Sequence, residues 1–298
     1  MDNSDIDSAQ RALEAGLLLL GQGDSAGAAR QLARARQHPA TRLTAHNLIE
    51  RNGLPGAFGE WMGVNCEISP RDDIYRFFDG HPTSVNPLRD YFADGWRTLS
   101  ELMLLLEAVD RPLLKMGSVL EFASGHGRFT RHLVKALGRE RVAVSDVVAD
   151  AVSFSRAAFG VNAFASAARP EDLNWPARYE LIFVLSLFSH LPHGSWGRWL
   201  KRLLDAVAPG GLLVFSTHGE EAARRQNLRL DEQGFFFAAS SESQVIDAQE
   251  YGTAFTAPAY VRAQMAEWAG QAQLLRFAPV WFWHHQDAWV LKKALHEF

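Results

Sequence analysis

The stretch from Val119 to Thr130 limits the folds open to this chain more than any other segment. An apolar run with one carboxylate, Glu121, leads into the mostly small residues Ala123-Ser124-Gly125-His126-Gly127 and then into a helical segment. Small residues let backbone N–H groups and the N-terminus of the next helix come close to a ligand. The segment therefore predicts a strand, a tight ligand-facing loop and a helix.

Short strand-like runs alternate with helical segments from residue 117 onward. Such alternation is typical of a doubly wound, mostly parallel sheet with helices on both faces. We expect helices between the first five strands. The seven expected strands are 119–122, 142–146, 162–165, 180–185, 212–217, 273–280 and 287–292.

The last two expected strands are joined by a short link, residues 281–286. A parallel crossover needs about a dozen residues or more, so this pair must be antiparallel. The sequence thus predicts an α/β fold: a Rossmann-like, doubly wound, mostly parallel seven-stranded sheet with an antiparallel last strand.

An all-α N-terminal region precedes this sheet. Residues 8–51 carry helical periodicity, and a Gly-Asp turn between Ala-rich helices resembles one tetratricopeptide unit. Such repeats need stacking neighbours, so a small helical bundle is the favoured interpretation. A cluster of breaker residues at 52–56 ends the region. The expected divisions are a helical module (1–56), an irregular, aromatic lead-in that ends in a long helix (57–116), and a catalytic domain (117–298) with an insertion (218–257).

The composition argues against several other classes of protein. The net charge of −4 disfavours a nucleic-acid binder, which usually presents a basic face. Cys66 is the only cysteine, so an internal disulfide and a cysteine-based zinc site are excluded. The apolar runs are too short to span a membrane, and the acidic N-terminus lacks the basic start of a signal peptide. We expect a cytoplasmic protein with neither nucleic acid nor membrane as a partner.

An acidic residue, Asp146, ends the second expected strand, nineteen positions after Gly127. An acid at this place in a doubly wound sheet suits the two hydroxyls of a ribose. Together with the loop at 123–127, it predicts a nucleoside-containing cofactor where the strand order reverses. The dinucleotide pattern G-x-G-x-x-G is incomplete, because Arg128-Phe129 follows and the third glycine is missing.

With these features the chain resembles the class I S-adenosylmethionine-dependent methyltransferases, of bacterial type and with no acceptor assigned. The first motif of that family is acid-x-Gly-x-Gly-x-Gly. Here it reads Glu121-x-Ala123-x-Gly125-x-Gly127, with alanine in place of the first glycine. A Pro-Gly-Gly turn at 208–211 is similar to the family's turn into its fifth strand.

The resemblance covers about residues 117–293 and implies S-adenosyl-L-methionine as the cofactor. The first motif would line its methionine half, Asp146 would bind the ribose, and Val147 would pack on the adenine. Ser166 falls where such enzymes contact the adenine edge, although many members carry an acid there. The implied cofactor-binding residues are Glu121, Ala123, Gly125, Gly127, Asp146, Val147, Ser166, Leu185 and Ser186.

The same resemblance narrows the acceptor of the methyl group. Methylation at carbon 5 of cytosine needs a cysteine in the catalytic domain, and Cys66 lies outside it. The segment Leu185-Ser186-Leu187-Phe188 replaces the motif of adenine and glutamine N-methyltransferases. The paired glutamates of arginine methyltransferases and the metal ligands of catechol methyltransferases are also missing. A hydroxyl, carboxyl or amine of a small molecule or glycan remains, and we favour oxygen.

Two histidines are the leading candidates for a general base. Histidine titrates near neutral pH and commonly serves as the base in catalysis. His190 follows the fourth expected strand and His218 the fifth, both at the edge where ligands bind such sheets. A packed or capping role is the alternative for each, and an acceptor that is already a free amine or carboxylate needs no base. His193 could join His190 on a helix face, but two ligands do not make a metal site, so no metal is expected.

Two features leave alternatives open. The insertion at 218–257 is either a lid over the site or a plain hairpin packed on the helices. The N-terminal residues 1–51 could bind a protein partner. A non-catalytic interaction or regulatory protein that retains a nucleoside pocket is therefore the main alternative, and a nicotinamide oxidoreductase is a weaker one.

Overall fold

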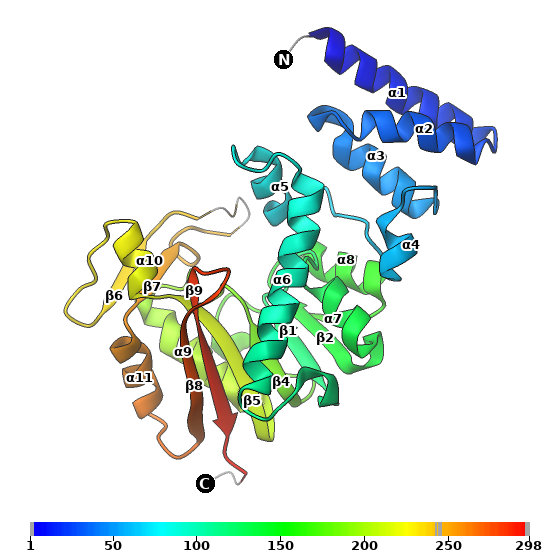
Figure 1. Ribbon diagram of the computed structural model, residues 1–298. Coiled ribbons are helices and arrows are strands. Elements are labelled where there is room, and N and C mark those ends of the chain that lie inside the picture. Colours follow the sequence, from blue (N-terminus) through cyan, green and yellow to red (C-terminus); the bar gives the residue numbers. More distant parts are fainter. Residues whose placement is uncertain (1–2, 242, 244–245, 296–298) are drawn as a thin grey trace.

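Seven strands form the central sheet, as the sequence predicts. The structure is a computed structural model that describes residues 3–241, 243 and 246–295. The sheet strands run in the order β3-β2-β1-β4-β5-β9-β8 (Figure 1). Their bounds are β1 Val119–Phe122, β2 Val142–Asp146, β3 Asn162–Ala165, β4 Tyr179–Val184, β5 Val207–His218, β8 Ala272–Phe282 and β9 Gln286–Lys293.

The direction of the strands confirms the predicted fold class. The strands β1 to β5 are parallel to one another, whereas β9 is antiparallel to both β5 and β8. The strand order reverses at β1, which lies between β2 and β4. In open α/β sheets, ligands bind beyond the carboxyl ends of the strands at this switch point.

Helices cover both faces of the sheet. The helices α6, α7 and α8 pack on one face, and α9 and α11 on the other. Neighbouring residues of β4, such as Leu181 and Ile182, are both fully buried but belong to opposite cores. The helix bounds here are α6 Pro87–Glu107, α7 Thr130–Leu137, α8 Ala149–Phe159, α9 His193–Ala206, α10 Glu220–Arg225 and α11 Pro258–Ala266.

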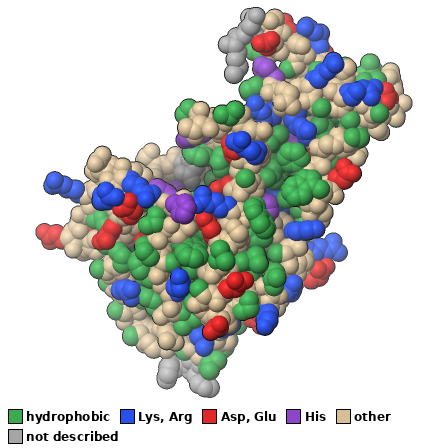
Figure 2. Space-filling view, viewed as in Figure 1, with side chains coloured by type: hydrophobic (Ala, Val, Ile, Leu, Met, Phe, Trp, Pro, Cys, Tyr) green, Lys and Arg blue, Asp and Glu red, His purple; other side chains and the backbone are tan. Residues whose placement is uncertain are grey.

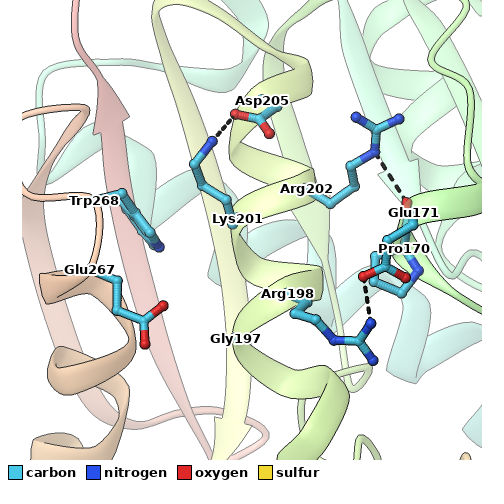
Figure 3. Close-up of a pocket in the computed structure, with 9 residues that line it drawn as sticks. All are labelled: Pro170, Glu171, Gly197, Arg198, Lys201, Arg202, Asp205, Glu267 and Trp268. Carbon is cyan, nitrogen blue, oxygen red and sulfur yellow. Dashed lines mark hydrogen bonds and ion pairs between the residues drawn. The ribbon is translucent and has the colours of Figure 1, made fainter. Parts of the chain in front are cut away.

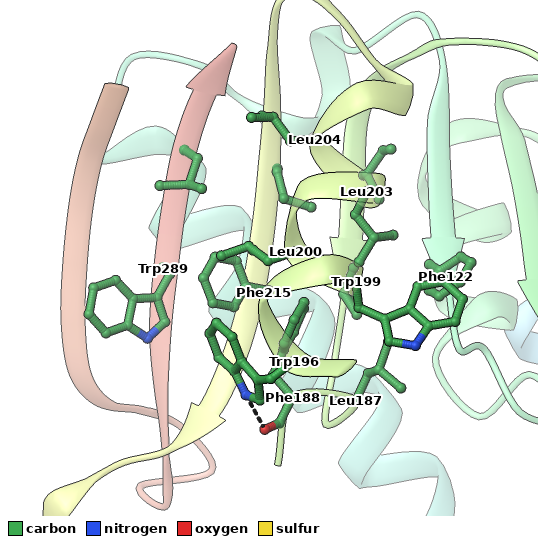
Figure 4. Packing of buried hydrophobic residues seen from close by; sticks show 14 of the residues in the cluster. Phe122, Leu187, Phe188, Trp196, Trp199, Leu200, Leu203, Leu204, Phe215 and Trp289 are labelled. Carbon is green, nitrogen blue, oxygen red and sulfur yellow. Dashed lines mark hydrogen bonds between the residues drawn. The ribbon is translucent and has the colours of Figure 1, made fainter. Parts of the chain in front are cut away.

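Aromatic side chains fill the core under α9 (Figure 4). Trp196 packs edge-on against Phe215 of β5, and Phe215 stacks on Trp289 of β9 with ring centres 6.1 Å apart. The indole N–H of Trp196 donates to the carbonyl oxygen of Phe188 at 3.0 Å. Its polar atom is therefore satisfied, and it ties α9 to the loop that follows β4.

Two details differ from the expectations, whereas the insertion contains a hairpin, which is one of the alternatives left open for it. Between β3 and β4 there is only the 3₁₀ turn Pro170–Asp172 in place of an α-helix, since Pro170 and Pro176 interrupt this stretch. The lead-in, expected to be irregular, contains the short helices α4 Phe58–Met62 and α5 Asp73–Gly80. The insertion forms an antiparallel hairpin of β6 Phe235–Ala238 and β7 Thr253–Thr256.

Three N-terminal helices project from the catalytic core (Figure 1). They are α1 Asn3–Gly21, α2 Ser25–Ala35 and α3 Pro39–Arg51, and Asp24 caps α2 by accepting a bond from the N–H of Gly27. The Asn47 side chain of α3 forms two hydrogen bonds with the backbone of Ile68. The helices are thus anchored to the lead-in, and the domain divisions proposed above remain a prediction. No described helix has the length and apolar character needed to cross a membrane.

Candidate active site

The loop after β1 turns through three residues with positive φ: Ala123 (+60°), Gly125 (+55°) and Gly127 (+82°). A Cβ atom added at Gly125 would have no described atom within 4 Å. At Gly127 it would lie 2.3 Å from the ring of Phe159. The backbone at Gly125 is therefore open to a ligand, whereas Gly127 is required by packing against α8.

Ala123 holds a conformation that glycine adopts more easily. The left-handed region costs a non-glycine residue roughly 1–2 kcal/mol. The strand-to-helix turn forms nevertheless, so the alanine does not prevent it. Strain of this kind is retained where the surrounding structure demands it, often at ligand sites.

Asp146 connects the end of β2 to the loop after β1. Its carboxylate accepts hydrogen bonds from the N–H of Gly125 at 2.7 Å and of Val148 at 2.8 Å. Burial raises the pKa of Asp146 above its usual value, while these backbone bonds oppose the rise. The carboxylate thus lies beside the open position of the loop.

Glu121 is a second buried carboxyl at the same place. Thr130 donates its hydroxyl to Glu121 Oε2 at 2.6 Å. Burial raises the pKa of Glu121 to about 8, with a smaller upward contribution from the charge of Asp146. No ion pair of Glu121 is found in the described part of the chain, so a cationic group of a ligand could stabilise its charged form.

The residues expected near the adenine lie beyond β2 and β3. The side chain of Val147 is 42% exposed, which leaves an apolar surface for a ring. The N–H of Ser166 donates to the carbonyl oxygen of Asp146 at 2.8 Å, so the ends of the two strands are joined. Both residues are therefore close to the acid expected to bind the ribose.

An ion-pair cluster beside the loop after β1, formed by His126, Asp150 and Arg71, has no counterpart among the sequence motifs. His126 Nε2 lies 3.0 Å from Asp150 Oδ2, and Arg71 forms an ion pair with Asp150 Oδ1 at 2.8 Å. Arg71 belongs to the lead-in and precedes Asp150 by 79 residues in the chain. A local sequence pattern does not predict this ion pair, because it forms only when the lead-in packs against the catalytic core.

The loop after β4 begins with Leu185 and Ser186, and Ser186 has a φ of +61°. Its N–H donates to Ser216 Oγ at 2.9 Å, and its Oγ accepts from Gln286 Nε2 at 2.7 Å. The strained residue is therefore held by two strands, β5 and β9. Gln286 is buried and was not among the residues singled out from the sequence.

His190 is oriented by the insertion. Its Nδ1 lies 2.6 Å from the carbonyl oxygen of Gly252, and its ring stacks on Tyr251 with ring centres 4.3 Å apart. A carbonyl oxygen only accepts, so Nδ1 carries the proton and Nε2 has the lone pair of the neutral ring. This is how the base of a catalytic pair is commonly oriented.

His218 lies near His190 but in a different environment. The two ring centres are 6.2 Å apart, and His285 lies 4.9 Å from His218. Burial is the main cause that lowers the pKa of His218 to about 3, with smaller contributions in the same direction from His285 and His190. His218 is therefore neutral at physiological pH. The described residues contain no group of three or more His, Cys, Asp or Glu arranged to hold a metal ion.

The other histidines considered from the sequence lie elsewhere. His193 Nδ1 is 2.9 Å from the hydroxyl of Tyr260, on the side of α11. His284 is exposed, and histidine side chains are visible on the surface where β8 turns into β9 (Figure 2). Neither contacts the loop after β1.

A shallow pocket of about 370 Å³ lies on the outer side of α9 (Figure 3). Its cations already have partners: Arg198 pairs with Glu171, Lys201 with Asp205, and Arg202 donates to a backbone carbonyl. None of the residues predicted for the site lines it. Its charges are thus balanced, and it carries no sign of a ligand site.

Comparison with known families identifies the class of this protein. A family described as a methyltransferase domain matches residues 94–275, which is more than half of the chain. The chain therefore belongs to this family, as the motif around Glu121 indicates. It is an S-adenosylmethionine-dependent methyltransferase of class I. No curated protein matches the chain in sequence.

The chain is also similar to several solved structures. DesVI from Streptomyces venezuelae has 14% sequence identity and a TM-score of 0.50, over 76% of this chain and 100% of DesVI. An S-adenosylmethionine-dependent methyltransferase from Clostridium acetobutylicum has 13% identity and a TM-score of 0.49, over 70% and 96%. The N-methyltransferase NodS from Bradyrhizobium japonicum, in complex with S-adenosyl-L-homocysteine, has 15% identity and a TM-score of 0.45, over 74% and 99%.

Proposed function

We propose that this enzyme methylates an oxygen atom of a small molecule or glycan and that His190 is its general base. The observation that carries the proposal is the bond from His190 Nδ1 to the carbonyl of Gly252. In the neutral ring this bond places the proton on Nδ1, so Nε2 is the nitrogen that can accept a proton. A hydroxyl acceptor must lose a proton, whereas a free amine or carboxylate need not.

The cofactor would be held by the residues around the loop after β1. When bound, S-adenosyl-L-methionine supplies an electrophilic methyl group on a sulfonium. Gly125 leaves room for its close approach, and Glu121 offers a buried carboxyl to its positive charge. Asp146 would bind the ribose and Val147 would cover the adenine. The remaining residues proposed to contact the cofactor are Ala123, Gly127, Ser166, Leu185 and Ser186.

His218 is less suited than His190 to accept a proton. Its pKa of about 3 makes proton uptake unfavourable near neutral pH. Its Nε2 also lies 3.3 Å from Gln286 Nε2, which is a hydrogen-bond donor. We propose that His218 shapes the wall of the acceptor site, while His190 takes the proton of the hydroxyl as the new C–O bond forms.

In the proposed active site, the insertion orients His190. Tyr251 and Gly252 supply both the ring that stacks on His190 and the carbonyl that orients it. The N–H of Gly252 in turn donates to the carbonyl oxygen of His190 at 2.9 Å. The segment thus acts as more than a packed hairpin, since it holds the base in one orientation.

The test is a turnover assay with methyl-labelled cofactor and a panel of phenols, glycosides, carboxylic acids and amines. We expect turnover of hydroxyl acceptors and a loss of about 10²-fold or more in kcat/KM in His190→Gln. His193→Gln is the matched control, since the rings that His193 contacts are those of Tyr260 and Phe235 and not that of Tyr251. Turnover confined to amines and unchanged in His190→Gln would contradict the proposal.

A further inference from the structure

Ser186, Ser216 and Gln286 form a closed ring of hydrogen bonds where β4 and β5 end and β9 begins, and the side chains of Ser216 and Gln286 are buried. The N–H of Ser186 donates to Ser216 Oγ at 2.9 Å. Ser216 Oγ donates to Gln286 Oε1 at 2.6 Å, and Gln286 Nε2 donates to Ser186 Oγ at 2.7 Å. In this arrangement the amide oxygen of Gln286 faces Ser216 and its amide nitrogen faces Ser186.

The ring determines what Ser186 can do. Its Oγ accepts from Gln286, so its own hydroxyl proton points out of the ring. Ser186 lies directly after β4, at the sheet edge where ligands bind. Its hydroxyl is therefore prepared to donate to a group in the acceptor site.

The same amide determines the tautomer of His218. Gln286 Nε2 lies 3.3 Å from His218 Nε2. An amide nitrogen only donates, so His218 Nε2 is the acceptor and the ring proton is on Nδ1. Among the described residues, His218 Nδ1 is buried and has no hydrogen-bond partner.

Gln286 is held in place by its position in the sheet. It is the first residue of β9 and lies opposite His218 in the antiparallel register of β5 and β9. The turn before it is pinned to α6, because the N–H of Trp283 donates to Glu101 Oε2 at 3.1 Å. The side chain is only 3% exposed, so its amide has few alternative orientations.

We propose that Gln286 is a positioning residue of the acceptor site, which makes Ser186 Oγ a hydrogen-bond donor and keeps His218 as the Nδ1–H tautomer. The inference deepens the proposed function and rests on it. It explains why His218, although close to His190, does not compete for the proton of the acceptor.

The test is nuclear magnetic resonance of the ring nitrogens in full-length protein with ¹⁵N-labelled histidine, with His218→Gln used to assign the signals. We expect the Nδ1–H tautomer of His218 in the wild type and no protonation between pH 5 and 8. The titratable groups that face His218 are His190 and His285. In Gln286→Glu, a carboxylate replaces the donor, and the pKa of His218 should rise by about 1–3 units.

Gln273→Glu is the matched control, because it makes the same change at an exposed position of β8 and should leave His218 unaffected. If Gln286→Glu does not fold, Gln286→Met should instead give a mixture of both tautomers. An Nε2–H tautomer in the wild type would overturn the inference. These spectra need neither cofactor nor acceptor, whereas the proposed function is tested by turnover, so the two can fail separately.

Discussion

The buried guanidinium of Arg131 donates from Nε to the carbonyl oxygen of Gly127 at 3.0 Å. A second nitrogen of the same group donates to the carbonyl oxygen of Glu67 in the lead-in, also at 3.0 Å. The side chain is fully buried and lies over the rings of Tyr91 and Phe92. One cation therefore joins the loop after β1 to the segment that precedes the sheet.

Replacing Arg131 should loosen both connections. The carbonyl of Glu67 would lose its bond from Arg131, whereas that of Gly127 would keep the backbone N–H of Arg131 at 3.4 Å. A carbonyl left without a partner costs about 1–3 kcal/mol, so Arg131→Met should lower the free energy of unfolding by that amount. Hydrogen exchange of residues 63–72 should become faster. Arg139→Met, at an exposed position, is the control. Unchanged exchange at 63–72 in Arg131→Met would show that Arg131 does not hold the lead-in.

Alanine at the two glycines of the loop should have different effects, although both have positive φ. Gly127→Ala places a Cβ 2.3 Å from Phe159 and should cost about 1–3 kcal/mol beyond the backbone strain. Gly125→Ala should remain folded but bind S-adenosyl-L-homocysteine roughly tenfold more weakly, since its Cβ faces the open side. Chemical denaturation and calorimetry measure the two effects. Equal losses of stability in both variants would be inconsistent with this account.

Glu121 should make the ligand-free enzyme less stable as the pH rises. The folded-state pKa of about 8 is above the unfolded value of 4.5, so the folded state holds one extra proton between these pH values. Stability should therefore fall by about 1.4 kcal/mol per pH unit in this window. Glu121→Gln should remove this slope, as measured by urea denaturation from pH 6 to 8. The same slope in the variant would argue against a protonated Glu121.

His46 should have the opposite effect at acidic pH. Burial lowers the pKa of His46 to about 4 in the folded state, below the ordinary 6.5. The neutral form therefore contributes stability above pH 6.5, which is lost as the pH falls toward 4. His46→Gln can keep the bond to the carbonyl of Cys66 and should weaken the acid dependence by about 1.4 kcal/mol per pH unit. An unchanged dependence between pH 5 and 6 would refute this assignment.

The sequence was informative wherever the signal is local. The apolar periodicity of the strands predicts the sheet, and the short link before residue 287 predicts the reversed strand. The type and spacing of Gly125 and Gly127 predict the ligand-facing loop after the first strand. Arg131 and Gln286 could not be recognised in this way, because their roles arise from contacts between segments far apart in the chain. Arg71 and Asp150, for example, meet only after the lead-in docks on the core.

The most direct test of the central claim is calorimetric titration of S-adenosyl-L-homocysteine into the wild type and Asp146→Asn. Asparagine keeps one acceptor oxygen, and so one of the two bonds from the N–H groups of Gly125 and Val148, but it lacks the charge expected to bind the ribose hydroxyls. We predict binding in the micromolar range for the wild type and a loss of roughly tenfold or more in a folded variant. Equal affinity in both proteins would contradict the assignment of Asp146, and no binding to folded wild type would contradict the cofactor site as a whole.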